Sequence, residues 1–140
     1  MTVWTVAHAR RALAVPYLKD GRSWLGWDCW GVVVVAGRDL FGLQGLPDVP
    51  DPPQGGLAAR ASAFADHARA WDPVAVADAC PGDVVLFGQG RAAVHCGLIV
   101  APGVVLHAEA ARGTLAEALA RPLSIGLCAL GAYRWAGARA

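Results

Sequence analysis

The sequence has little charge and no excess of either sign. Charged residues make up 16% of its 140 residues, and Lys+Arg 12 against Asp+Glu 11 gives a formal net charge of +1. A basic patch that could hold nucleic acid through its phosphates is therefore not expected. Hydrophobic residues make up 56%, which together with the low charge excludes intrinsic disorder for most of the chain. We expect a folded protein that does not bind nucleic acid.

Long hydrophobic runs are also missing. The longest one covers only residues 32–36, whereas a helix that crosses a bilayer needs about 20 apolar residues. Near the start, His8, Arg10 and Arg11 interrupt the stretch where a secretory signal would need its apolar run. We therefore expect no membrane insertion and a protein made in the cytoplasm without a signal peptide. The length predicts a single domain over residues 1–140.

Close cysteine pairs are absent as well. No two of the four cysteines have the C-x-x-C spacing of zinc and redox sites, and we expect free thiols. A zinc site made from Cys29, His95 and His107 is disfavoured, because structural zinc ligands usually come in close pairs. The sequence therefore predicts neither a metal nor another cofactor.

The order of the predicted elements indicates an α+β fold, with N-terminal helices packed on a C-terminal antiparallel sheet. Hydrophobic spacing and turn signals predict helices over residues 2–14, 29–41, 57–71 and, briefly, 114–120. Strands are predicted over residues 83–87, 94–100, 104–109 and 127–135. The segment from about 42 to 56 is rich in proline and glycine and is predicted to be an irregular insertion loop.

The segment 26–35 contains a cysteine where its anion would be stabilised. The β-branched run 32–35 also fits a strand, but Asp28 is a good helix N-cap, so we prefer a helix. Cys29 then lies in the first turn, where free N–H groups and the helix dipole favour negative charge. Such a position lowers the pKa of a thiol, and a thiolate is the nucleophile that acyl transfer needs. The alternative is a buried structural cysteine.

The segment 93–109 predicts a hairpin that brings two histidines together. With a three-residue loop over 101–103, Val100 faces Val104, and His95 and His107 become diagonal neighbours on one face. A two- or four-residue loop would place them on opposite faces. A thiol, a base and an orienting acceptor form a catalytic triad, which Cys29, His95 and His107 could supply. The alternative is a pair of buried core histidines.

Four short motifs then follow one another along the chain. They are Asp28-Cys29-Trp30-Gly31, Pro81-Gly82-Asp83-Val84-Val85-Leu86-Phe87, His95-Cys96-Gly97 and Leu106-His107-Ala108. In this order and spacing the sequence resembles the NlpC/p60 family of papain-like cell-wall cysteine peptidases over most of its length. The resemblance implies that Cys29 is the nucleophile, His95 the base and His107 the orienting residue.

The resemblance also implies a substrate and further site residues. The family cleaves peptide bonds in peptidoglycan stem peptides. Tyr17 matches a family tyrosine near the oxyanion site, and Asp28 matches an aspartate beside the nucleophile. Trp30 stands where members often have serine, and we expect it to form a wall of the substrate groove or an anchor for a partner, with core packing as the alternative.

Trp30 and the ending 131–135 resemble the phage-tail branch of the family. This implies that tail hub or tip proteins are partners, that the protein is incorporated in a virion or a gene-transfer particle, and that it acts in the cell wall or periplasm of the target. Two alternatives stay open. One is a structural tail-tip component with a latent site, and the other is an N-acetylmuramoyl-L-alanine amidase.

Overall fold

Two helices form the N-terminal part of the computed structural model, which describes residues 4–47, 63, 65–66 and 68–135. Helix α1 spans Val6–Leu13. Thr5 caps its N-terminus, and the Thr5 side chain accepts the His8 N–H. Helix α2 spans Cys29–Phe41 and ends at Gly42, which adopts φ 67°, a left-handed conformation that glycine allows. The predicted bounds of α2 are confirmed, and the β-branched run in it is helical.

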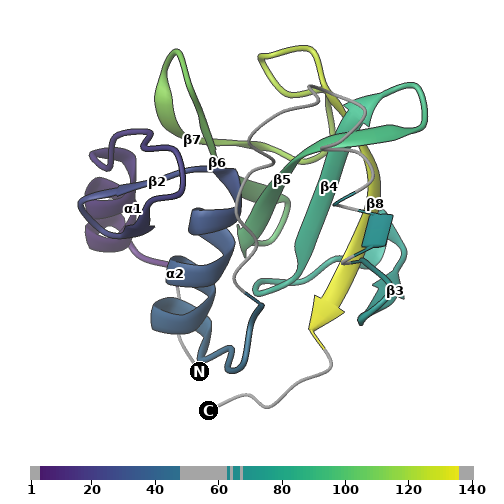
Figure 1. Cartoon of the computed structure of the whole chain (residues 1–140), viewed down its shortest axis with the longest axis horizontal. Helices are drawn as coiled ribbons and strands as arrows, with labels where there is room; N and C mark the ends of the chain where they lie inside the picture. The colour runs from purple at the N-terminus through teal and green to yellow at the C-terminus, as the bar shows by residue number, and fades with distance from the viewer. Residues whose placement is uncertain (1–3, 48–62, 64, 67, 136–140) are drawn as a thin grey trace.

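The C-terminal part is a six-stranded antiparallel sheet with strand order β3-β8-β4-β5-β6-β7 (Figure 1). A small hairpin joins α1 to α2, and a single 3-10 turn, η1, follows β3. The bounds are β1 Arg22–Ser23, β2 Gly26–Trp27, β3 Trp71–Val74, η1 Val76–Asp78, β4 Val84–Gln89, β5 Ala92–Ala101, β6 Val104–Glu109, β7 Gly113–Ala118 and β8 Cys128–Trp135. The predicted α+β class is confirmed.

Two predicted elements are wrong. The segment predicted as a short helix over 114–120 is strand β7, which pairs with β6 along its whole length. Trp71, predicted as the end of a helix, opens β3 and pairs with Trp135 of β8. In both places, pairing with a neighbouring strand outweighs the helical preference of an alanine-rich sequence.

Two other predictions fall partly on residues that are not described. Of the predicted helix 57–71, residues 63, 65, 66 and 68 are helical, and most of the others lie outside the described residues. Of the predicted insertion loop 42–56, residues 42–47 form neither a helix nor a strand of the sheet, and 48–56 lie outside the described residues.

The sheet separates two apolar clusters. One lies between α2 and the sheet and includes Val32, Val35, Leu98 and Leu106, all fully buried. The other is formed by alternate residues of the same strands together with Leu123. Each fully buried side chain of this size contributes about 1.5–3 kcal/mol, so the contact with the sheet holds α2 firmly in place.

The β5–β6 hairpin reaches its predicted register by a different route. Ala101 pairs with Val104, so the connection has two residues, Pro102 and Gly103, rather than three. A β-bulge between Ile99 and Ala101 absorbs the extra residue, and Leu98 then faces Leu106, as predicted. The bulge therefore keeps both histidines of the hairpin on one face of the sheet.

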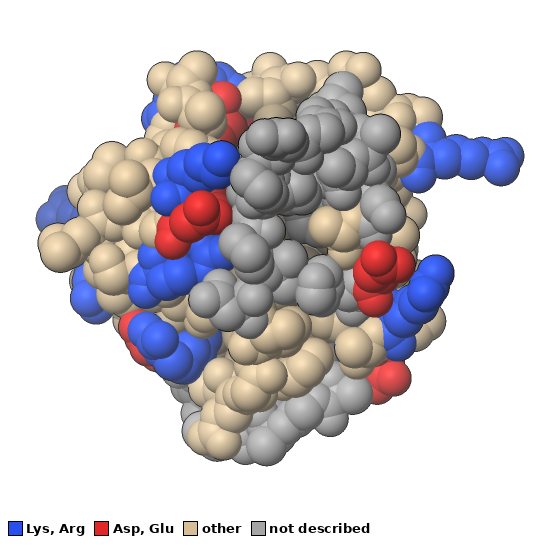
Figure 2. All heavy atoms as spheres, in the orientation of Figure 1, with Lys and Arg blue, Asp and Glu red and all other residues tan. Residues whose placement is uncertain are grey.

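The surface shows mixed charge on the face drawn in Figure 2. Basic and acidic side chains lie next to one another over the helical side and again near the opposite edge of this face. Within the described part of the chain, no helix combines the length and apolar character that a membrane crossing requires.

Candidate functional site

Cys29 is the first residue of α2 and lines a pocket of about 560 Å³. Its side chain is largely covered, with 9% of the residue exposed. His95 of β5, Tyr17 and Glu109 line the same pocket. The thiol is therefore placed at the meeting point of the helix N-terminus and the sheet.

Close packing against the β1–β2 hairpin fixes the start of α2. A Cβ atom added to Gly31 would overlap the carbonyl oxygen of Gly21 and the Cβ atom of Trp27. Only glycine permits this approach, which places the first turn of the helix directly against the preceding loop.

Asp28 ties the loop and the helix together. Its side chain accepts hydrogen bonds from the N–H groups of Gly31 at 2.8 Å and Asp20 at 2.9 Å, and from the guanidinium of Arg22 at 2.8 Å. Burial raises the pKa of Asp28, although the Gly31 N–H and the charge of Arg22 act in the opposite direction. The predicted N-cap is confirmed. Asp28 is not among the residues that line the pocket around Cys29.

The pKa of the Cys29 thiol lies well below its ordinary value. A hydrogen bond with the Cys96 side chain is the largest cause. Burial opposes it, and a hydrogen bond with His95 and the charge of His95 lower the pKa further. Cys29 is therefore poised to exist as a thiolate beside an imidazole, which is the state a nucleophile needs.

The two histidines of the β5–β6 hairpin are in direct contact. His95 Nε2 lies 2.9 Å from His107 Nδ1, and the two rings are nearly perpendicular at 89°. His107 is fully buried, whereas His95 is 6% exposed and reaches the pocket. Burial, followed by the charge of His95, lowers the pKa of His107, which favours its neutral form.

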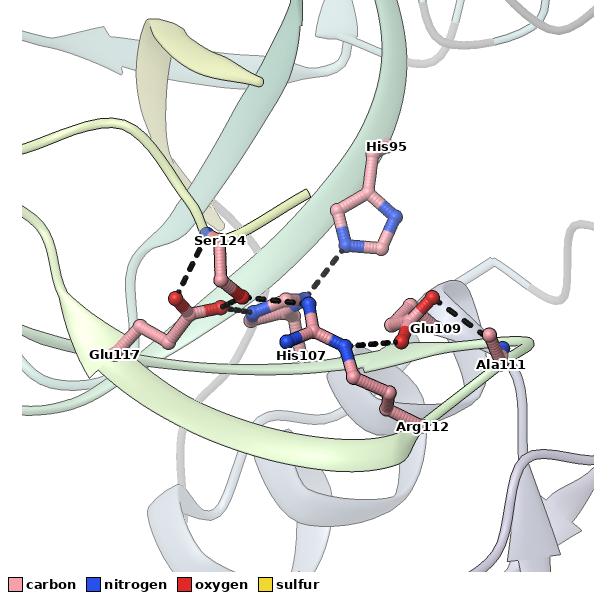
Figure 3. A network of polar contacts seen from close by, with 7 residues as sticks. All are labelled: His95, His107, Glu109, Ala111, Arg112, Glu117 and Ser124. Atoms are coloured by element: carbon pink, nitrogen blue, oxygen red, sulfur yellow. Dashed lines mark hydrogen bonds and ion pairs between the residues drawn. The ribbon is translucent and has the colours of Figure 1, made fainter. Parts of the chain in front are cut away.

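A carboxylate continues this line of contacts on the next strand (Figure 3). Glu117 Oε2 of β7 lies 2.6 Å from His107 Nε2. Burial raises the pKa of Glu117, but hydrogen bonds from the Ser124 N–H and from His107 outweigh it and hold the pKa below its ordinary value. Arg112 donates to both Glu109 and Ser124 and so connects this end of the network to the pocket wall.

Tyr17 is brought to the pocket by backbone pairing with the β1–β2 hairpin. It forms an isolated bridge with Trp27, and the Leu18 N–H donates to the Trp27 carbonyl at 3.0 Å. Trp27 is fully buried, and its indole donates to Thr114 of β7 at 2.8 Å. The tyrosine therefore lies on a loop that both the helix and the sheet anchor.

Trp24 and Trp30, which flank Cys29 in the sequence, make contacts with other residues of the chain. Trp30 donates its indole N–H to the Pro47 carbonyl at 2.9 Å and packs edge-on against Trp71. Trp24 donates to Asp39, and the Arg11 guanidinium lies 4.1 Å above its ring. Trp30 is not among the residues that line the pocket around Cys29. For Trp30 the contacts match core packing.

Sequence reasoning missed two residues of this arrangement. Cys96 was recognised only as part of a motif, and its contact with Cys29 depends on how α2 packs on β5. Glu117 was missed because its segment was predicted to be helical and is a strand. An alternating reading of residues 113–118 would have placed Glu117 two residues away from the partner of His107, in reach of its ring.

The arrangement fits nucleophilic chemistry at a carbonyl group. A low-pKa thiol, an imidazole beside it and an acceptor behind that imidazole are the three elements of a thiol hydrolase site. The N–H of Cys29 is not needed inside the helix, because it lies in the first turn. Among the residues described, no group of three His, Cys, Asp or Glu side chains is arranged to hold a metal ion.

Comparisons with known proteins agree with this geometry. The model of the NlpC/P60 family matches residues 14–123. The NlpC/p60 domain of the peptidoglycan hydrolase SagA has a similar fold, with a TM-score of 0.53 and 19% sequence identity over 82% of this chain and 86% of that one. The search of curated proteins finds no match.

A second solved structure is an NLP/P60-family protein from Staphylococcus aureus described as similar to a lipoprotein. It has a TM-score of 0.58 and 22% identity, and the match covers 93% of this chain but only 40% of that one. The family model covers most of the chain, and the two folds agree with it. The chain is therefore a member of the NlpC/P60 family.

Proposed function

We propose that the protein is a cysteine peptidase that hydrolyses amide bonds in the stem peptides of peptidoglycan. The observation that carries this proposal is the position of Cys29, at the helix N-terminus, with its pKa lowered and with His95 beside it in an open pocket. Family membership supports the reaction class. The SagA domain, which is described as part of a peptidoglycan hydrolase, supports the substrate class.

In the proposed reaction, the Cys29 thiolate attacks the carbonyl carbon and forms a tetrahedral intermediate. The N–H of Cys29 and the hydroxyl of Tyr17 stabilise its oxyanion. His95 then gives the proton taken from the thiol to the leaving amine, and a thioester remains. Water, deprotonated by His95, attacks the thioester, releases the new carboxylate and restores the thiol. His107 orients His95 throughout.

The roles of Asp28 and Trp30 in this proposal are indirect. Asp28 holds the first turn of α2 and the loop that carries Tyr17, through Gly31 and Asp20. Trp30 fixes the chain beyond α2 through the Pro47 carbonyl. Both keep the pocket in shape, and neither is assigned a contact with substrate.

The test is a digest of purified cell-wall sacculi by the wild type and by Cys29→Ala. We expect the wild type to release fragments whose masses correspond to cleavage within the stem peptide and Cys29→Ala to release none, with an unchanged circular dichroism spectrum. Cys80→Ala is the matched control, because Cys80 is an exposed thiol that does not line the pocket. Hydrolysis by Cys29→Ala at the wild-type rate would refute the assignment.

The same fragments separate the peptidase from an N-acetylmuramoyl-L-alanine amidase. An amidase leaves intact stem peptides and peptide-free glycan, whereas a peptidase leaves glycan that still carries the first residues of each stem. We propose the peptidase, so intact free stem peptides in the digest would favour the amidase instead.

We also propose that the protein acts from a phage tail or a related gene-transfer particle, with tail hub or tip proteins as partners. The residues that support this are Trp30 and the segment 131–135, where the sequence resembles the phage-tail branch. Mass spectrometry of purified particles from the producing strain tests it: the protein is expected in the tail fraction, and its absence from every particle would overturn the proposal.

A purely structural tail component with a latent site is the competing function. Leu18 and Leu25, 56% and 87% exposed, favour it because apolar side chains on a surface loop suit a protein contact. The reactivity of the Cys29 thiol distinguishes the two functions. Alkylation of Cys29 by iodoacetamide no faster than that of Cys80 would favour the latent site, and faster alkylation of Cys29 supports the peptidase.

A further inference from the structure

We propose that Glu117 is a positioning residue that fixes the proton arrangement of both histidines, so that Nδ1 of His95 is the atom that receives the Cys29 proton. This inference rests on the proposed function, because it assigns a task within that site. It is drawn from the hydrogen bonds around His107 and from the strand register.

The three side chains form one row across three neighbouring strands. On β6 and β7, His107 faces Leu115, and Glu117 is two residues further along β7. On β5 and β6, the register places His95 in the same diagonal relation to His107. Figure 3 shows the row, with the His107 ring lying between His95 and Glu117.

The direction of each hydrogen bond follows from the chemistry of the acceptor. An ionised carboxylate only accepts, so His107 Nε2 must carry the hydrogen that points to Glu117 at 2.6 Å. Burial keeps His107 neutral, and its Nδ1 is then an acceptor. His95 Nε2 lies 2.9 Å from that Nδ1 and must donate to it. This leaves Nδ1 of His95 to face the thiol.

Glu117 is itself held so that both of its oxygens must accept. Oε1 accepts the Ser124 N–H at 2.8 Å, and Oε2 accepts the Ser124 hydroxyl at 3.0 Å in addition to His107. An amide in its place would point an NH₂ group either at the Ser124 N–H or at His107. In the second orientation His107 would have to move its hydrogen to Nδ1, which would break the contact with His95.

Among the charged groups around these three side chains, Glu117 is the anion that contacts His107 on the side away from His95. His95 and Cys29 lie on the pocket side of His107, and both affect its pKa. On the other side, Arg112 pairs with Glu109 at 2.8 Å and donates to the Ser124 hydroxyl, which in turn donates to Glu117. When the thiol proton moves to His95, the positive charge that forms there is therefore stabilised through His107 by Glu117.

The decisive variant is Glu117→Gln, read out by alkylation of Cys29, which needs no substrate. Iodoacetamide is added across a range of pH, and modification at Cys29 is followed by peptide mass spectrometry, because other thiols are exposed. We expect the midpoint of the profile to move to higher pH, with Cys29 reacting about tenfold more slowly at pH 6 than in the wild type. Glu117→Asp keeps the charge and should recover part of the rate.

Asp72→Asn is the matched control, because it removes an exposed carboxylate on β3 without touching the row. Its profile is expected to overlay that of the wild type. If Glu117→Gln lowers hydrolysis while its alkylation profile also overlays the wild type, Glu117 is merely structural and the proposal is wrong.

The wild type provides a test that does not depend on any variant folding. Nitrogen-15 NMR distinguishes protonated from unprotonated ring nitrogens, and we expect hydrogen on Nε2 and none on Nδ1 for His107. Hydrogen on Nδ1 of His107 would overturn the inference. The proposed function fails separately, if Cys29→Ala still digests sacculi, so the two failures are distinguishable.

Discussion

At the scale of single residues, the site depends on which groups surround one sulfur atom. Hydrogen bonds from Cys96 and His95 and the charge of His95 lower the pKa of Cys29, and burial raises it. The helix N-terminus also favours negative charge at this position. The helix position of Cys29 and its pairing with His95 were both predicted from the sequence. The contribution of Cys96 needed the packing of α2 on β5.

The lowered pKa of Cys29 predicts a specific pH dependence of its reactivity. Because the pKa lies well below its ordinary value, the thiolate persists to lower pH than in an ordinary cysteine and is lost as the pH falls through that lowered pKa. We expect iodoacetamide to modify Cys29 about tenfold faster than Cys80 at pH 6, since the lower intrinsic nucleophilicity of a low-pKa thiol offsets part of the gain. Peptide mass spectrometry after timed quenching measures both sites in one sample.

Tyr17→Phe tests the proposal that the Tyr17 hydroxyl is the second oxyanion donor. The variant keeps the ring in the pocket and removes only the hydroxyl, so we expect kcat to fall by about 100-fold with little change in KM. Tyr133→Phe is the control, because Tyr133 lies on β8, outside the lining of this pocket. An unchanged kcat for Tyr17→Phe would assign the oxyanion site to backbone N–H groups alone.

At the scale of elements, one buried hydroxyl joins the loop that carries Tyr17 to the sheet. Thr114 accepts the Trp27 indole N–H and donates to the Val15 carbonyl, both at 2.8 Å. The threonine is 5% exposed, so neither partner could replace the bond with water. β7 therefore fixes the loop as well as supplying Glu117.

Thr114→Val should destabilise the protein although its size hardly changes. It leaves the Trp27 N–H and the Val15 carbonyl without partners, and we expect a loss of about 2–4 kcal/mol in the free energy of unfolding, measured by urea denaturation. Thr114→Ser retains the hydroxyl and should lose about 1 kcal/mol at most. An unchanged stability of Thr114→Val would show that the two hydrogen bonds contribute little and would contradict the prediction.

The elements also show what the sequence could predict. The bounds of α2 and the face shared by His95 and His107 were predicted correctly, because a helix cap and strand alternation are local signals. β7 was missed, since its alanine-rich segment becomes a strand only by pairing with β6. The bulge near Val100 was also missed. The predicted three-residue loop and the observed two-residue turn with a bulge give the same register, so the hydrophobic pattern does not distinguish them.

At the scale of the whole molecule, aromatic contacts link the helical part to the far edge of the sheet. The Trp30 ring packs on Trp71, and Trp71 packs on Trp135 with their centroids 4.8 Å apart. Because α2 shares a core with β4, β5 and β6, the helices cannot detach without exposing it. That residues 1–140 form one domain stays a prediction, which unfolding experiments can test.

A single domain should unfold in one cooperative step. We expect the urea transitions followed by tryptophan fluorescence and by far-ultraviolet circular dichroism to coincide, since tryptophans lie in both the helical part and the sheet. Two separated transitions would contradict the prediction and indicate that the helices and the sheet unfold independently.

Asp28 carries a consequence for how this protein can change over generations. One carboxylate anchors the start of the helix through Gly31 and the preceding loop through Asp20 and Arg22. A substitution there is expected to disturb the first turn that carries Cys29 and the loop that follows Tyr17 at the same time. Variation in substrate preference is therefore expected to accumulate instead on the pocket wall contributed by Gln89, Val94 and Leu127.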